Sequence, residues 1–212
     1  PLDKTIDFIL DLEKKIGTTK LTKESITINN FSAVRKPEQF EFTKYYKINN
    51  LIFKVEFSSE YECFSIHLKF AHLEIKNNNK TSFTFTVFSS NNAVFLYIDK
   101  AFIGSWDKKE IHFFQGKFSM ELIQKIHQKE ENKWLGVFHA SAVSNGKKSI
   151  LFLGDSGNGK STSLALLQAN GFTCLADDFV PIDRDKKKVY SFPAAISIKK
   201  NSLETLLPIY PE

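Results

Sequence analysis

A glycine-rich stretch at residues 154–161 carries the residue types that hold phosphate groups. Its sequence, GDSGNGKS, fits the pattern G-x-x-x-x-G-K-[ST]. Glycines let backbone N–H groups point inward at phosphate oxygens, the lysine neutralises the β- and γ-phosphates, and the last hydroxyl suits Mg²⁺. We therefore predict that this stretch binds ATP, or another nucleoside triphosphate, with Mg²⁺. The residues expected at the nucleotide are Gly154, Asp155, Ser156, Gly157, Asn158, Gly159, Lys160, Ser161 and Thr162, with Lys160 also catalytic and Ser161 also a metal ligand.

Two adjacent carboxylates, Asp177 and Asp178, follow an apolar run that ends at Ala176. Adjacent side chains at the end of a strand point in different directions. One carboxylate can therefore hold Mg²⁺ while the other accepts the proton of a substrate hydroxyl. The alternative is an aspartate pair that only opens a turn. Beside a phosphate-binding loop, the catalytic interpretation is favoured.

His139 lies within another apolar run, where a histidine is more often a packed core residue than a catalytic one. Its run leads through a turn into the strand before the glycine-rich loop, so the ring could lie near the γ-phosphate. There an imidazole can orient an aspartate or pair with it. His139 is therefore a catalytic candidate, whereas the other four histidines show no metal-ligand spacing.

Short apolar runs predict the elements that must position these residues. Residues 149–153 form a near-continuous apolar run, which is expected of a strand buried on both faces. Asn145-Gly146 is the signal of a tight hairpin before it. The expected elements are strands over 134–143, 149–153 and 172–176, and a short helix over 163–168.

The first 132 residues show a different pattern, in which alternating apolar positions predict a meander of antiparallel strands. The Phe-rich faces of these strands are expected to form core rather than platforms for nucleic-acid bases. A helix is expected over 119–132, with Ser119 as its N-cap, and residues 129–132 are the best candidate linker. The strands are expected over 40–45, 51–57, 82–88, 93–99 and 110–114, after a helix over 3–16.

Composition excludes several classes of protein. The chain has 212 residues, 42% hydrophobic and 25% charged, which is typical of a folded globular protein. No apolar run is long enough for a membrane span, and no signal peptide is visible, so we expect a cytoplasmic protein without membrane contact. Cys63 and Cys174 are expected as free thiols. Of the 29 lysines and arginines, Arg35 and Arg184 are the two arginines and the others are lysines. Because proteins that recognise nucleic acids rely on arginine, this composition favours a solvated basic surface over a nucleic-acid partner.

Three motifs together resemble the catalytic core of the HPr kinase/phosphorylase family, which is structurally related to phosphoenolpyruvate carboxykinase. They are His139-Ala140-Ser141, the stretch 154–161, and Leu175-Ala176-Asp177-Asp178, and their intervals match the family pattern. The resemblance implies that Ser161 and Asp178 hold Mg²⁺. It also implies that Asp177 is the base that activates a serine hydroxyl, assisted by His139.

The fold implied is α+β: a β-rich antiparallel N-terminal domain over 1–132 and a P-loop α/β kinase core over 133–212. The core is expected to be incomplete at its C-terminus. Residues 189–198 stand where the family has a Glu and an Arg-Gly-rich signature, and they contain no Glu and no Gly. Within them, Ser191-Phe192-Pro193 resembles instead the diverged kinases that act on free serine or on peptide precursors, so HPr is not the expected substrate.

The leading hypothesis is an ATP-dependent kinase that phosphorylates a serine or another hydroxyl of a small molecule, peptide or protein. The N-terminal domain would present or select that substrate, and the resemblance suggests a homo-oligomer. A different class of function is a regulatory module that binds nucleotide without efficient transfer. Carboxykinase-like chemistry on an organic acid is disfavoured, because the Arg-rich anion site that such substrates need is absent.

Overall fold

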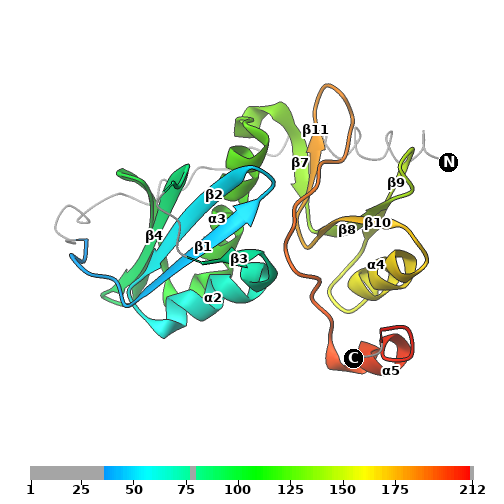
Figure 1. Cartoon of the computed structure of the whole chain (residues 1–212), viewed down its shortest axis with the longest axis horizontal. Coiled ribbons are helices and arrows are strands. Elements are labelled where there is room, and N and C mark those ends of the chain that lie inside the picture. Colours follow the sequence, from blue (N-terminus) through cyan, green and yellow to red (C-terminus); the bar gives the residue numbers. More distant parts are fainter. Residues whose placement is uncertain (1–35, 77–79, 211–212) are drawn as a thin grey trace. The chain divides into compact units, whose positions relative to one another are not determined.

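A computed structural model describes residues 36–76 and 80–210 (Figure 1). These residues belong to one compact unit of mixed α+β structure, within which the expected domain boundary at 132/133 falls. The helix expected over 3–16 lies outside the described residues. Helices and a largely antiparallel sheet region confirm the coarse fold class. Within the two described ranges, no helix is long and apolar enough to cross a membrane.

A six-stranded sheet with the order β3-β1-β2-β4-β5-β6 forms the first part of the unit. Its pairings are antiparallel except for β2 against β4, which is parallel. A parallel pair needs a crossover, and helix α2 (Glu60–Phe70) supplies part of it. The strands are β1 (Phe42–Ile48), β2 (Leu51–Phe57), β3 (Glu74–Ile75), β4 (Phe83–Ser90), β5 (Ala93–Ile98) and β6 (Ala101–Asp107).

Helix α2 and strand β6 were not predicted, and a simple meander was therefore wrong. The N-terminus of α2 has the pattern Ser-x-x-Glu, and the Ser59 hydroxyl donates a short hydrogen bond to the Glu62 carboxylate. Glu62 is buried, with 1% of its surface exposed. The strand expected over 110–114 is also wrong, because helix α3 (Ile111–His127) begins there.

Helix α3 has its apolar residues three or four positions apart, a helical period that outweighs the short alternation at 110–114. Ser119 is therefore inside the helix rather than its N-cap, and its hydroxyl donates to the Gln115 carbonyl at 2.9 Å. The helix ends at a left-handed Gln128, with φ 50°. The buried side chains of the helix are Phe114, Phe118, Ser119, Leu122 and Ile123.

Phenylalanine rings form the core between the sheet and these helices, as predicted. Phe53 and Phe83 stack at 5.5 Å, and Phe85 lies 4.3 Å from Phe118 of α3, measured between ring centroids. Phe118 also contacts Phe70 of α2 at 6.1 Å. Except for Phe83, which is 6% exposed, these rings are fully buried. Both helices therefore share one core with the sheet.

The second part of the unit contains a three-stranded sheet with the order β10-β8-β9 and a two-stranded pair β11-β7, all antiparallel. The predicted hairpin is confirmed between β8 and β9, with Gly146 at φ 87°. None of the residues of β9 is buried, and Ile150 and Leu153 are 45% and 47% exposed, so the prediction that this strand is buried on both faces was wrong. The strands are β7 (Trp134–Phe138), β8 (Ala140–Ser144), β9 (Ser149–Leu153), β10 (Thr173–Asp177) and β11 (Val180–Asp183).

The single strand expected over 134–143 is divided at His139, since β7 pairs with β11 while β8 pairs with β9 and β10. The candidate linker is also fixed in place. Lys129 makes a short ion pair with Asp183 and lies over the Tyr190 ring at 4.7 Å.

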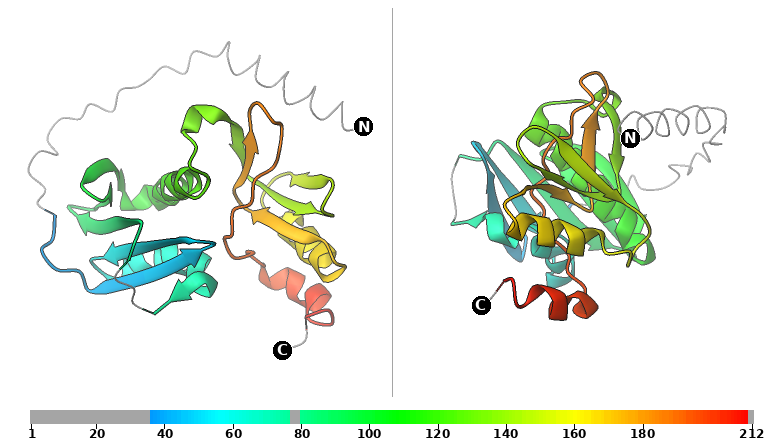
Figure 2. Two further views of the ribbon diagram at one scale, coloured as in Figure 1. Left: turned by 45° about the horizontal axis from the view of Figure 1, so that its top comes forward. Right: turned by 90° about the vertical axis from the view of Figure 1, so that its right-hand side faces the viewer.

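Helix α4 (Lys160–Ala169) confirms the helix predicted after the glycine-rich loop, and α5 (Leu203–Leu206) lies beside it (Figure 2). Single turns of 3₁₀ helix cover Ala71–Leu73, Lys108–Glu110, Glu131–Lys133 and Lys200–Ser202.

Candidate functional site

The glycine-rich loop connects the end of β9 to the start of α4. Gly157 has φ 100° and Gly159 has φ 77°, which are left-handed conformations that glycine adopts without a Cβ penalty. Gly159 caps α4, and its carbonyl accepts from the Ser163 N–H at 2.8 Å. The N-terminus of a ten-residue helix therefore opens into the loop, where its free N–H groups and dipole favour an anion.

Lys160 is the first residue of α4 and turns back over the loop. Its Nζ donates to the Gly154 carbonyl at 2.7 Å and to the Asp155 carbonyl at 3.0 Å. The ammonium group thus lies above the backbone that would hold phosphate. This is where a cation can neutralise phosphate oxygens.

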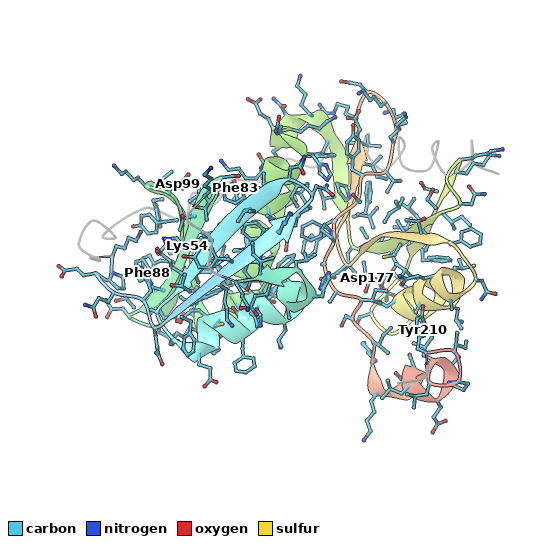
Figure 3. All side chains as sticks on the ribbon, viewed as in Figure 1. Lys54, Phe83, Phe88, Asp99, Asp177 and Tyr210 are labelled. Atoms are coloured by element: carbon cyan, nitrogen blue, oxygen red, sulfur yellow. The ribbon has the colours of Figure 1, made fainter. Side chains whose placement is uncertain are left out.

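Asp177 is the last residue of β10 and is labelled in Figure 3. It is 2% exposed and accepts hydrogen bonds on both carboxylate oxygens. Its Oδ1 accepts a short bond from the Ser141 hydroxyl and a 3.0 Å bond from the Ser161 hydroxyl. Its Oδ2 accepts from the Ser197 N–H at 3.0 Å. Three donors surround a buried carboxylate, and one of them is the hydroxyl that follows Lys160.

Asp178 differs from its neighbour in conformation and surroundings. Its backbone has φ 72°, and the Phe179 N–H bonds to the Asp177 carbonyl at 2.9 Å, so the chain makes a three-residue turn at Asp178. A positive φ is uncommon for residues other than glycine, and aspartate is one of the side chains that tolerate it best. The Asp178 carboxylate is about one-third exposed, and its Oδ1 lies 2.8 Å from His139 Nδ1. The turn therefore separates the two carboxylates.

His139 lies in the break between β7 and β8, and 63% of its side chain is exposed. It is not a packed core residue, which was the alternative interpretation of its apolar surroundings. The break releases the ring from both sheets and lets it reach Asp178. The structure thus brings the predicted histidine to the predicted aspartate pair.

Lys69, in the last turn of α2, reaches the same carboxylate. Its Nζ is 3.1 Å from Asp178 Oδ2 and 5.4 Å from the centre of the Phe179 ring. The Lys69 carbonyl accepts from the Ala195 N–H at 2.8 Å, so this end of α2 is fixed by the backbone. Nothing local in the sequence connects Lys69 with Asp178, because 109 positions separate them.

The segment 192–202 crosses the site from β10 to α4. Phe192 pairs with Ala176 of β10 through an isolated parallel bridge. Further along, Lys199 Nζ donates to the Ser156 hydroxyl of the glycine-rich loop at 2.9 Å. At its end, the Thr162 hydroxyl donates to Ser202 Oγ at 2.8 Å. Thr162, which was expected at the nucleotide, therefore also contacts this segment.

Many of these groups line one pocket of about 390 Å³, among them Lys69, His139, Lys160, Ser161, Asp177 and Asp178. Among the described residues, no group of three His, Cys, Asp or Glu side chains could hold a metal ion. Mg²⁺ usually takes only one or two protein ligands and keeps waters and phosphate oxygens. Ser161 Oγ and Asp177 Oδ1 fit that requirement, since both are oxygens and they are 3.0 Å apart.

Most of the predicted residues converge on the pocket, but the pairing within them differs from what the resemblance implies. Ser161 is hydrogen-bonded to Asp177, whereas Asp178 is paired with His139 and Lys69. Gly154, Asp155 and Asn158 are not among the residues that line the pocket, although the Gly154 and Asp155 carbonyls accept hydrogen bonds from Lys160. The pocket residues that the sequence did not single out include Leu68, Lys69, Ser197 and Lys199.

One pKa shift lies beside the site. Burial raises the pKa of the Cys174 thiol, and the nearby Asp177 charge raises it further. A thiol with a raised pKa is a poor nucleophile at neutral pH. This agrees with a packing role for Cys174.

Comparison of the chain with protein-family models, with curated protein sequences and with solved structures found no match. The function must therefore be argued from the site itself.

Proposed function

We propose that this chain is a kinase that transfers the γ-phosphate of ATP, with Mg²⁺, to a hydroxyl of a small molecule, peptide or protein. One observation carries the proposal: the glycine-rich loop, two carboxylates and His139 face a single pocket. A phosphoryl transfer needs mainly positioning and neutralisation of charge. The loop backbone and Lys160 would hold the phosphates. Mg²⁺ bound at Ser161 and Asp177 would neutralise charge on the β- and γ-oxygens.

We assign the base to Asp178 rather than Asp177. Asp177 is buried and already accepts from Ser141, Ser161 and Ser197. Asp178 is exposed to the pocket, and His139 is close enough to orient it. In the proposed step, the acceptor oxygen bonds to the γ-phosphorus while the bond to the bridging β–γ oxygen breaks. ADP leaves with that electron pair, and the acceptor proton passes to Asp178.

The proposal is tested by turnover of Mg·ATP in the presence of free serine, a serine-containing peptide mixture and glycerol. We expect ADP release to rise with at least one of these hydroxyl acceptors, with a phosphorylated product of matching amount. Lys160→Ala should lose most of its nucleotide affinity, whereas Lys147→Ala, in the β8–β9 turn, should keep it. Binding of ATP without any transfer would favour the regulatory alternative, and absence of ATP binding would overturn both.

A further inference from the structure

The pocket has two chemically different ends. One end contains the loop, Lys160, Lys199 and Ser161, which the proposed function assigns to the nucleotide. The other end is formed by Leu68 and Lys69 of α2 and by residues 194–196. Its side chains are apolar except for Lys69. The proposed function leaves this end for the acceptor, which would meet the Lys69 ammonium group beside the Asp178 carboxylate.

Lys69 is held at this end by more than its ion pair. The Ala195 N–H bonds to its carbonyl, its ammonium group lies over Phe179, and the adjacent Phe70 contacts Phe192 at 5.8 Å. An exposed ion pair alone contributes little stability. Here the backbone and the aromatic packing already place the lysine, so the ion pair is free to be exchanged without loss of the local structure.

Lys69 lies beside the group that would accept the proton. Its Nζ is 3.1 Å from Asp178 Oδ2, and both residues line the pocket. An acceptor hydroxyl bound at Asp178 therefore lies close to the Lys69 ammonium group, and so do the atoms bonded next to that hydroxyl. A positive charge at that distance favours an anionic group there.

We propose that the acceptor carries an anionic group beside its hydroxyl and that Lys69 binds this anion. The inference rests on the proposed function and names its substrate class. Lys69 thereby becomes the residue that determines acceptor specificity. The acceptor would be a small carboxylate or a phosphate ester, and either one would carry a free hydroxyl near its anionic group. Helix α2, which ends 84 positions before Gly154, would thus build the acceptor site.

The test is calorimetric titration of the full chain saturated with Mg²⁺ and the non-hydrolysable analogue AMP-PNP. Two matched pairs of probes separate the sources of the anion: L-serine with L-serinamide, and glycerol 3-phosphate with glycerol. We expect at least one anionic probe to bind about tenfold or more tightly than its neutral partner. Lys69→Met should abolish this preference while it leaves AMP-PNP affinity and the neutral probes within about twofold. Lys69→Arg should keep most of the preference.

Lys200→Met is the matched control, because Lys200 is exposed and does not line the pocket. Melting temperatures show whether each variant is folded. Wild-type protein that binds AMP-PNP but shows no preference in either pair overturns the inference and leaves the proposed function standing. A preference that survives in Lys69→Met also overturns it, since another group then binds the anion. Failure to bind AMP-PNP would instead remove the proposed function.

Discussion

The Ser161 hydroxyl donates a 3.0 Å hydrogen bond to Asp177 Oδ1 across 16 positions of sequence. This bond connects the start of α4 with the end of β10. The carboxylate of Asp178, the next residue, instead contacts His139 and Lys69. The two adjacent aspartates therefore have different neighbours. This difference is the basis for giving them different roles.

Replacement of each aspartate by asparagine, in two separate variants, should distinguish those roles. Asp178→Asn should lower kcat about 100-fold or more, because general-base catalysis contributes that much, with Mg·ATP affinity nearly unchanged. Asp177→Asn should weaken Mg²⁺-dependent nucleotide binding about tenfold or more, because it alters the metal side of the site. Nucleotide affinity is measured with and without Mg²⁺, and turnover with the best acceptor. The opposite pattern would return the base to Asp177, as the family resemblance implies.

Lys199 should act as a second phosphate-binding cation. Its ammonium group donates a hydrogen bond to the Ser156 hydroxyl of the loop. It also lies beside Gly157: a Cβ atom added to that glycine would be 4.0 Å from Lys199 Nζ. We expect Lys199→Met to weaken ATP binding about tenfold, since charge-assisted bonds to phosphate are among the stronger ones. AMP should be affected much less than ATP in equilibrium titrations. Lys147→Met provides the control, and an equal loss in both variants would indicate a general effect of net charge.

The ion pair of Lys129 with Asp183 predicts a pH-dependent stability. The hydrogen bond from Lys129 is the main reason that the pKa of Asp183 falls from 3.8 to about 2. A lowered pKa in the folded state stabilises the protein above about pH 4, and this stabilisation is lost as the pH falls toward 2. Asp183→Asn should therefore melt several degrees lower than wild type at neutral pH.

The difference in melting temperature between wild type and Asp183→Asn should shrink between pH 4 and pH 2. Asp185→Asn is the control, because Asp185 is exposed and its hydrogen bond to Asp183 comes from its backbone N–H, which the substitution keeps. A difference that stays constant over this range would show that the Asp183 charge does not contribute to stability.

Phe192 should be a main support of the segment that crosses the site. It is 1% exposed and its ring contacts Phe70 and Phe179. Truncation to alanine leaves a cavity, so Phe192→Ala should lower the free energy of unfolding by about 3–5 kcal/mol. Phe113→Ala, at a ring that is 57% exposed, should change it by no more than about 0.5 kcal/mol. Urea denaturation measures both, and similar values for the two would contradict the packing described.

The sequence alone was sufficient for features that depend on neighbouring residues. The Asn-Gly turn between β8 and β9, the helix after the glycine-rich loop and strand β2 over 51–57 are all local patterns, and the structure contains them. The expected position of the strand before Asp177 was also close to β10. Turn residues and periodicity act over a few positions, so no distant contact is needed to predict them.

Local patterns were misleading where the outcome depended on distant partners. The alternation at 110–114 is too short to compete with the helical period of α3. The apolar run 149–153 does not reveal that the side chains of β9 are partly exposed, because their exposure depends on which distant elements pack against the two faces of the strand. The division of 134–143 at His139 likewise follows from two different pairing partners, β11 and the three-stranded sheet.

The sequence by itself determined which residue types could do chemistry: the glycine-rich loop, two aspartates and His139. Only the tertiary structure decided how they are paired. The left-handed turn at Asp178 separates the carboxylates, and folding brings Lys69 and Lys199 to the pocket from distant segments. The spacing of residues along a chain cannot specify such contacts, because packing of the core rings Phe70 and Phe192 brings these segments together.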